Sequence, residues 1–106
     1  MAIDNTLYDS LENTYKKIKE YLDTTKLGRE HSAMMMKHEA LADLLETFDI
    51  EALEEQSKDI DTLHAQLDAI TVVSVQIVKD LEAVDSALKV TNGLDEVFLK
   101  ITNIKV

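Results

Sequence analysis

The stretch that decides the fold is IDTLHAQLDAITVVSVQIVKDLEAVDSAL, which runs from Ile60 to Leu88. Apolar residues recur along it at alternating spacings of three and four, and the pattern extends back to Leu53. Such spacing is the heptad pattern of helices that pack as in a coiled coil. The members of this seam are Leu53, Gln56, Ile60, Leu63, Leu67, Ile70, Ser74, Ile77, Leu81, Val84 and Leu88.

Residues suited to helix ends bound this seam on both sides. Asp49 precedes it and has the side chain of a helix N-cap, while Asn92-Gly93 follows it and is typical of a helix end. We therefore expect one helix over 50–91, about 60 Å long at the standard rise per residue. A short amphipathic helix over 94–102 is expected after it.

The first half of the chain carries two apolar stripes that are out of phase. The step of five from Leu22 to Leu27 rotates the stripe around a helix, and weak helix formers, Gly28 among them, lie at this step. We expect a helix over 4–47 that is either kinked or broken at 24–29. The continuous form is favoured because no proline or turn dipeptide forces a stop.

Composition supports an all-α fold in a single domain over 1–106. The chain has two glycines and no proline, and a sheet protein of this size would need more of both in its turns. The expected architecture is a long antiparallel helical hairpin, with the possible kink near Gly28, that assembles into a helical bundle. At 45% hydrophobic residues the chain has enough apolar surface to bury a core.

The charge balance narrows the classes of partner. A net charge of −10 disfavours nucleic acid and anionic membrane surfaces, and it suits a protein partner with a basic surface. No run of 18 apolar residues is present, so no membrane span is expected. The first residues lack the basic and apolar parts of a signal peptide, and we therefore expect a cytoplasmic location.

Two segments are more apolar than a single seam requires. The residues from Ala69 to Val78 are apolar on nearly every side, and Met34 to Met36 sweep about 200° of a helix. A hairpin gives each helix one neighbour, so we expect two chains to form a four-helix bundle as a homodimer. A different chain could supply the other helices instead. The residues expected at the interface are Met34, Met35, Met36, Ile70, Val72, Val73, Val75 and Ile77.

The segment 29–39 also raises the question of a metal site. His31, Met34 and His38 share one helical face, and imidazole and thioether ligands suit Cu(I). Packing is the favoured interpretation, because the same face continues the apolar stripe and methionine fills irregular cores well. We therefore expect no cofactor, and the metal site remains the alternative.

No catalytic motif is present, since the chain lacks cysteine, a G-x-S-x-G elbow, a glycine-rich phosphate loop and H-E-x-x-H. We expect a non-enzymatic assembly protein: an adaptor, a small chaperone or a structural subunit. The alternative is an acidic inhibitor that occupies the nucleic-acid-binding surface of another protein. Its binding residues would be an acidic patch of Glu51, Glu54, Glu55, Asp59 and Asp61.

Overall fold

The computed structural model describes residues 6–104, and the expected helix start at residue 4 lies outside them. Within this range the chain forms five α-helices and one 3-10 turn, and no strand. The prediction of an all-α fold is confirmed. The elements are α1 (Thr6–Thr24), η1 (Arg29–His31), α2 (Ser32–Thr47), α3 (Ile50–Gln56), α4 (Ile60–Asp80) and α5 (Ser86–Thr102).

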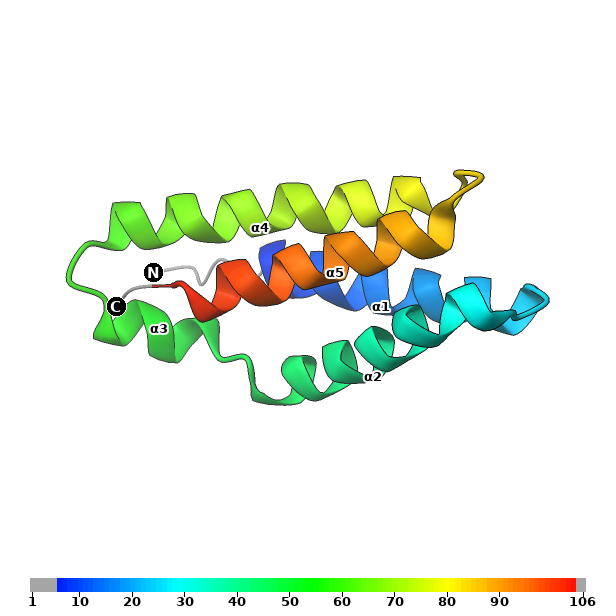
Figure 1. Ribbon diagram of the computed structural model, residues 1–106. Coiled ribbons are helices and arrows are strands. Elements are labelled where there is room, and N and C mark those ends of the chain that lie inside the picture. Colours follow the sequence, from blue (N-terminus) through cyan, green and yellow to red (C-terminus); the bar gives the residue numbers. More distant parts are fainter. Residues whose placement is uncertain (1–5, 105–106) are drawn as a thin grey trace.

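Four of these helices form a bundle, and the molecule is elongated, with extents of 46 × 19 × 18 Å. Helix α1 packs against α2 and α4, and α5 packs against the same two helices. Helices α2 and α4 therefore lie on one diagonal of the bundle, with α1 and α5 on the other (Figure 1). The short helix α3 lies at the end of the bundle opposite the α4–α5 turn (Figure 1).

The continuous helix favoured for 4–47 is wrong, and the break at 24–29 is what the structure contains. Helix α1 ends at Thr24, and the chain turns before η1 so that α2 packs against α1. The weak helix formers at this point lower the cost of stopping the helix. The backbone N–H of Gly28 donates to Nδ1 of His31 at 2.9 Å, which fixes the turn.

The single helix expected over 50–91 is also wrong, because the chain breaks at 57–59 and again at 81–85. At the first break Asp59 caps α4 by accepting a hydrogen bond from the backbone N–H of Thr62 at 3.2 Å. At the second break the chain turns back, and α5 packs along α4. The segment predicted as a separate helix over 94–102 is the second half of α5.

These breaks change how the apolar surface is covered. We expected a second chain to supply two of the four helices of a bundle, but the described residues of one chain supply all four. The seam prediction is right in its middle, where Leu63, Leu67, Ile70, Ser74 and Ile77 are buried. It is wrong at its ends, where Gln56, Ile60, Val84 and Leu88 are exposed.

Gly93 lies in the middle of α5 and does not end a helix. A Cβ atom at this position would lie 2.5 Å from Cγ1 of Ile77 in α4, closer than carbon atoms approach without a shift. The absence of a side chain therefore lets α5 lie close to α4. The glycine that we took for a helix end serves close packing between helices.

A buried polar cluster joins α1 to α4. Oγ1 of Thr14 lies 2.7 Å from Oγ of Ser74, and both residues are fully buried. The hydroxyl of Ser10 donates to Oγ of Ser74 at 3.0 Å. Thr14 in turn donates to the carbonyl oxygen of Ser10 at 2.9 Å, so each hydroxyl in the cluster has a partner.

The first prediction concerns the close contact of α4 and α5. Gly93→Ala should destabilise the protein by about 1–3 kcal/mol, because the added methyl group overpacks the contact with Ile77. An exposed helix would instead gain about 1 kcal/mol from the same change. Urea unfolding followed by circular dichroism measures the sign.

The matched control is Gly28→Ala, the other glycine of the chain. There the new Cβ would meet only the carboxylate end of the exposed Glu30 side chain, which can rotate away. We expect a change within about 0.5 kcal/mol. A Gly93→Ala protein as stable as wild type would contradict the close contact.

The second prediction concerns the buried hydroxyls. Thr14→Val keeps the shape of the side chain but leaves the hydroxyl of Ser74 without its acceptor, which should cost about 1–3 kcal/mol of unfolding free energy. Thr14→Ser retains the hydroxyl and should cost less. If the two variants are equally stable, the hydrogen bond to Ser74 does not contribute, and thermal unfolding of both decides the matter.

Candidate protein-interaction surface

The residues predicted to form an intermolecular interface do not share one surface. Met34, Ile70 and Ile77 lie in the core of the bundle and are at most 1% exposed. Their burial is provided by helices of the same chain. A hydrophobic seam and a hydrophobic interface have the same sequence pattern, so the periodicity could not separate these three residues from the exposed ones.

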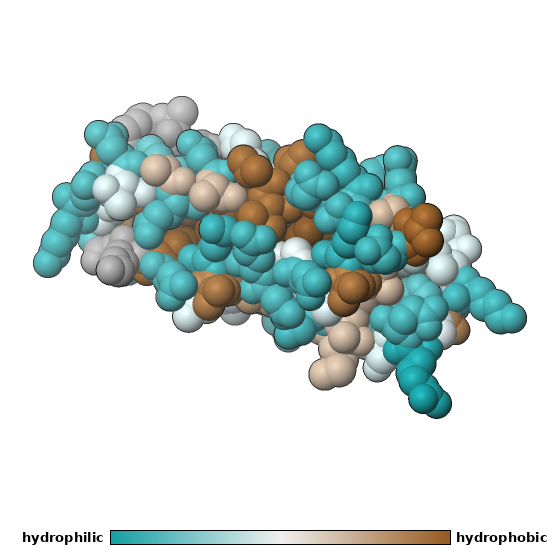
Figure 2. All heavy atoms as spheres, turned by 45° about the horizontal axis from the view of Figure 1, so that its top comes forward, coloured by the Kyte–Doolittle hydropathy of each residue, from teal (hydrophilic) through white to brown (hydrophobic). Residues whose placement is uncertain are grey.

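Part of the predicted interface is exposed along α4. Val72 is 69% exposed and Val75 is 46% exposed, and Ala65 and Ala69 are exposed on the same side of the helix. We call these four residues the α4 face. With this side of the molecule turned forward, Figure 2 shows hydrophobic side chains reaching the surface between hydrophilic ones. A run of apolar residues on the outer side of a helix is unusual unless it contacts something.

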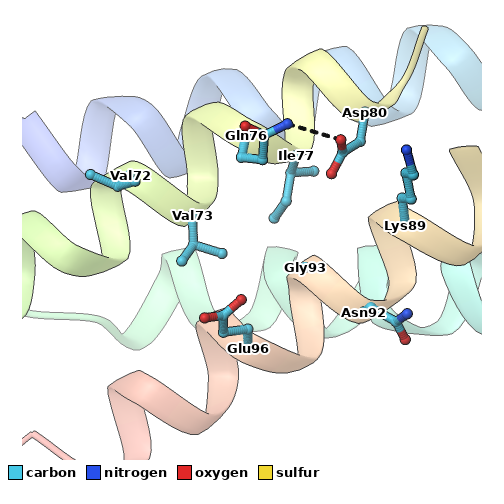
Figure 3. Close-up of a pocket in the computed structure, with 9 residues that line it drawn as sticks. All are labelled: Val72, Val73, Gln76, Ile77, Asp80, Lys89, Asn92, Gly93 and Glu96. Carbon is cyan, nitrogen blue, oxygen red and sulfur yellow. Dashed lines mark hydrogen bonds between the residues drawn. The ribbon is translucent and has the colours of Figure 1, made fainter. Parts of the chain in front are cut away.

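A groove lies beside the α4 face, between α4 and α5. It has a volume of about 490 Å³, and apolar side chains of Val72, Val73 and Ile77 line one part of it (Figure 3). We call it the α4–α5 groove. Gly93 forms part of its α5 wall. The other lining residues are Gln76, Asp80, Lys89, Asn92 and Glu96.

The polar part of the groove is held by hydrogen bonds and ion pairs within each helix. Nε2 of Gln76 donates to Oδ1 of Asp80 at 3.0 Å, as Figure 3 shows. Lys89 forms an ion pair at 3.6 Å with Asp85, which does not line the groove. Glu96 pairs with Lys100 at 3.9 Å. These contacts are exposed and weak, so an incoming cation could compete for the carboxylates of Asp80 and Glu96.

The remaining predicted interface residues lie on a different side of the bundle. Met35 is 42% exposed and Met36 is 69% exposed on α2, the helix diagonal to α4. A single partner helix therefore cannot cover the exposed methionines and the α4 face together. Of the predicted set, Val72 and Val73 are the residues that the fold brings together at the α4–α5 groove, and Val75 is exposed on the other side of Val72.

The histidine of the η1 turn, His31, belongs to a hydrogen-bond network. Its Nδ1 accepts from Gly28, so in the neutral ring Nε2 carries the proton and donates to the hydroxyl of Tyr21 at 3.3 Å. The hydroxyl oxygen of Tyr21 lies 2.7 Å from Oγ of Ser86 at the start of α5. Both ring nitrogens of His31 thus have protein partners, and a metal ion would have to displace them.

The other two histidines also make specific contacts. Nε2 of His38 donates to the carbonyl oxygen of Tyr15 at 3.0 Å, and the two rings stack with their centroids 4.2 Å apart. His64 lies 2.9 Å from the largely buried carboxylate of Glu54. Within residues 6–104 no group of three or more His, Asp or Glu side chains could hold a metal ion.

The acidic patch is divided by the structure. Glu54 is turned inward toward His64, and Asp59 is the N-cap of α4. Glu51, Glu55 and Asp61 remain exposed on α3 and the first turn of α4. The hydroxyl and the backbone N–H of Thr62 both donate to Asp59 and lower the pKa of its carboxyl group from the usual value of 3.8.

Two features of the molecule, one on the surface and one in the core, had no clear signal in the sequence. The polar residues of the groove come from α4 and α5, and only the turn at 81–85 brings them together. The buried cluster of Thr14 and Ser74 joins residues 60 positions apart. A polar residue inside the seam, Ser74, was the single indication that α4 has a polar contact in the core.

The third prediction concerns the N-cap of α4. Because the folded pKa of Asp59 is depressed, its charged form stabilises the protein above about pH 4, and this contribution is lost as the pH falls through the folded pKa. Asp59→Asn keeps a hydrogen-bond acceptor that does not titrate. We therefore expect wild type to exceed the variant in stability at pH 5–7, with the difference shrinking below about pH 4.

Urea unfolding of both proteins between pH 3 and pH 7 measures this difference. Glu55→Gln is the control, since it removes one exposed carboxylate that caps no helix. A stability difference for Asp59→Asn that does not change with pH would contradict the role of the carboxylate charge.

The chain was compared with protein-family models, curated proteins and solved structures, and none of them matches it. No helix within residues 6–104 is long and apolar enough to cross a membrane. The α4 face and the groove beside it are the features of residues 6–104 that bear most directly on function.

Proposed function

We propose that this chain is a non-enzymatic helical interaction protein, an adaptor, small chaperone or structural subunit, that binds a partner through the α4 face and the α4–α5 groove. The observation that supports this most is Val72. It is 69% exposed in the middle of α4, although the inner side of the same helix is packed in the core. Val73 and Ile77 continue the apolar surface from Val72 into the groove.

The shape of this site suits a helix of the partner. A helix laid along the α4–α5 groove would place apolar side chains against Val72 and Val73. The carboxylates of Asp80 and Glu96 would then meet Lys or Arg at the edge of the contact. We propose a partner that is both apolar and basic on one side.

Homodimerisation through the same face is less well supported than binding of a different protein. Each chain carries a net charge of −10, and packing two α4 faces together would bring like charges close to each other. The amount of exposed apolar surface on one helix is also small for a permanent dimer, which buries about 800 Å² or more on each partner.

The acidic inhibitor is a second candidate, and it would use a different part of the molecule. The exposed carboxylates of Glu51, Glu55 and Asp61 favour it, because they gather at one end of the bundle beside α3. Long-range attraction would dominate such binding, so it should weaken strongly with salt. Binding through the α4 face should depend less on salt, since burial of apolar surface contributes more.

The fourth prediction compares two exposed positions on opposite sides of the bundle. Val72→Asp should reduce retention of the partner at least 10-fold, because it places a charge in an apolar contact. Met36→Asp is the matched control, since Met36 is also 69% exposed but lies on α2. Immobilised wild-type and variant proteins are compared for the proteins they retain from an extract, quantified by mass spectrometry.

Both variants should unfold at nearly the wild-type temperature, because neither side chain lies in the core. Equal retention by Val72→Asp and wild type would overturn the binding role of the α4 face. If a retained protein is instead lost from Glu51→Lys and Asp61→Lys and released by salt, the acidic inhibitor is the better description.

A further inference from the structure

The turn between α4 and α5 is built from residues that favour a helix. Its sequence, Leu81-Glu82-Ala83-Val84-Asp85, has neither glycine nor proline, and its first three residues are strong helix formers. The turn also keeps much of the helical path. The N–H groups of Leu81, Glu82 and Ala83 donate to carbonyl oxygens three residues earlier, at 3.0–3.4 Å.

The reversal itself is concentrated near the end of this turn. Leu81 has helical dihedral angles, φ −61° and ψ −23°, whereas Asp85 has φ −101° and ψ 39°. Asp85 occupies the N-cap position of α5, but its side chain accepts no capping hydrogen bond there. The local sequence therefore stabilises this turn little, and the packing of α5 against α2 and α4 holds it closed.

The closed turn leaves apolar residues in water. Val84 is fully exposed at its tip, and Leu88 is 61% exposed in the first turn of α5. Both continue the seam of Ile77 and Leu81 at helical spacing. A helix that ran on through the turn would place these four residues on one side.

We infer that α4 and α5 join into one helix over 60–102 in a second form of the protein, in which two copies of the chain exchange α5. Each α5 then completes the bundle of the other copy. We call the structure described above the closed form. Its contacts of α5 would form again in the exchanged dimer, but between the two chains. They include the approach of Gly93 to Ile77 and the ion pair of Lys37 with Asp95, which is 2.7 Å in the closed form.

The second copy is the occupant that fits the exposed seam residues. The two long helices would cross antiparallel at the former turn, about an axis near Val84. Leu81 of each copy would lie beside Leu88 of the other, and Val84 beside its own counterpart. In the structure Val84 and Leu88 are exposed to water and Leu81 is partly buried, whereas the exchanged form covers Val84 and Leu88.

Exchange joins the bundles end to end at the turn, so the two α4 faces stay apart. Glu82 and Asp85 of both copies approach each other there, so added salt should favour this dimer. This inference concerns self-association through α5, and it does not depend on the binding role proposed for the α4 face.

Two variants that complement each other test the exchange. Gly93→Val enlarges one side of the contact with Ile77, and Ile77→Ala shortens the other, so each variant alone is impaired. In an exchanged dimer of the two variants, each contact joins α4 of one copy to α5 of the other. One contact then has Ile77 and Gly93, as in wild type. The other has the shortened side chain at position 77 and the enlarged one at position 93.

The two variants are unfolded together, refolded at high concentration and examined by native mass spectrometry and thermal unfolding. We expect mixed dimers in excess over both homodimers, with a Tm above that of either variant refolded alone. Monomers that melt independently would overturn the proposal. Dimers in the statistical ratio of 1:2:1 would also overturn it, because they would show association without exchange.

A second experiment does not depend on impaired variants. Wild-type protein refolded at high concentration should contain more dimer than protein refolded at low concentration, and the dimer should dissociate slowly on dilution. Ala83→Gly should lower the dimerisation constant by about 10-fold or more, because each chain must make the turn helical. Native mass spectrometry measures the constant.

Ala40→Gly is the matched control. Ala40 is exposed in α2 and stays helical in both forms, so this change should leave the dimerisation constant unaltered. Equal effects of the two substitutions, or a wild-type protein that remains monomeric after refolding at high concentration, would overturn the exchange of α5.

Discussion

The close approach of α5 to α4 at Gly93 is the constraint on which the rest of the structure depends. Once the chain has turned back after α4, α5 buries its own apolar side and closes the bundle against α2. Without this return, the inner surfaces of α2 and α4 would lack a neighbour. The absence of a side chain at position 93 therefore allows a single chain to form a four-helix bundle, which would otherwise need two hairpins.

The sequence predicts the helical class and the middle of the core, because periodicity depends on local geometry. The seam residues between Leu63 and Ile77 are buried in the core, as their spacing predicts. At 81–85 the spacing predicts a continuous helix and is wrong, because the heptad pattern and the helix-forming residues continue through a segment that turns. Only the free energy of packing α5, contributed by residues such as Leu94 and Val97, decides that the chain reverses there.

Histidine roles could be predicted only in part, and for a similar reason. His31 and His38 follow the apolar stripe, so their burial was foreseeable. Their partners, Tyr21 and the carbonyl group of Tyr15, belong to another helix, and pairing across helices has no signature in one sequence. The candidate surface is likewise only partly predictable: Val72 and Val75 stand out as apolar, but the groove exists because two distant segments lie side by side.

The buried cluster of Thr14 and Ser74 has a consequence for folding during synthesis. Ser74 follows Thr14 by 60 residues, so at 5–20 residues per second the ribosome takes about 3–12 s to supply it. Helices α1 and α2 can pair before then, but the hydroxyl of Thr14 must wait, solvated, for α4. Until α4 is present, the hydroxyl of Thr14 has only the carbonyl oxygen of Ser10, in its own helix, as a protein partner.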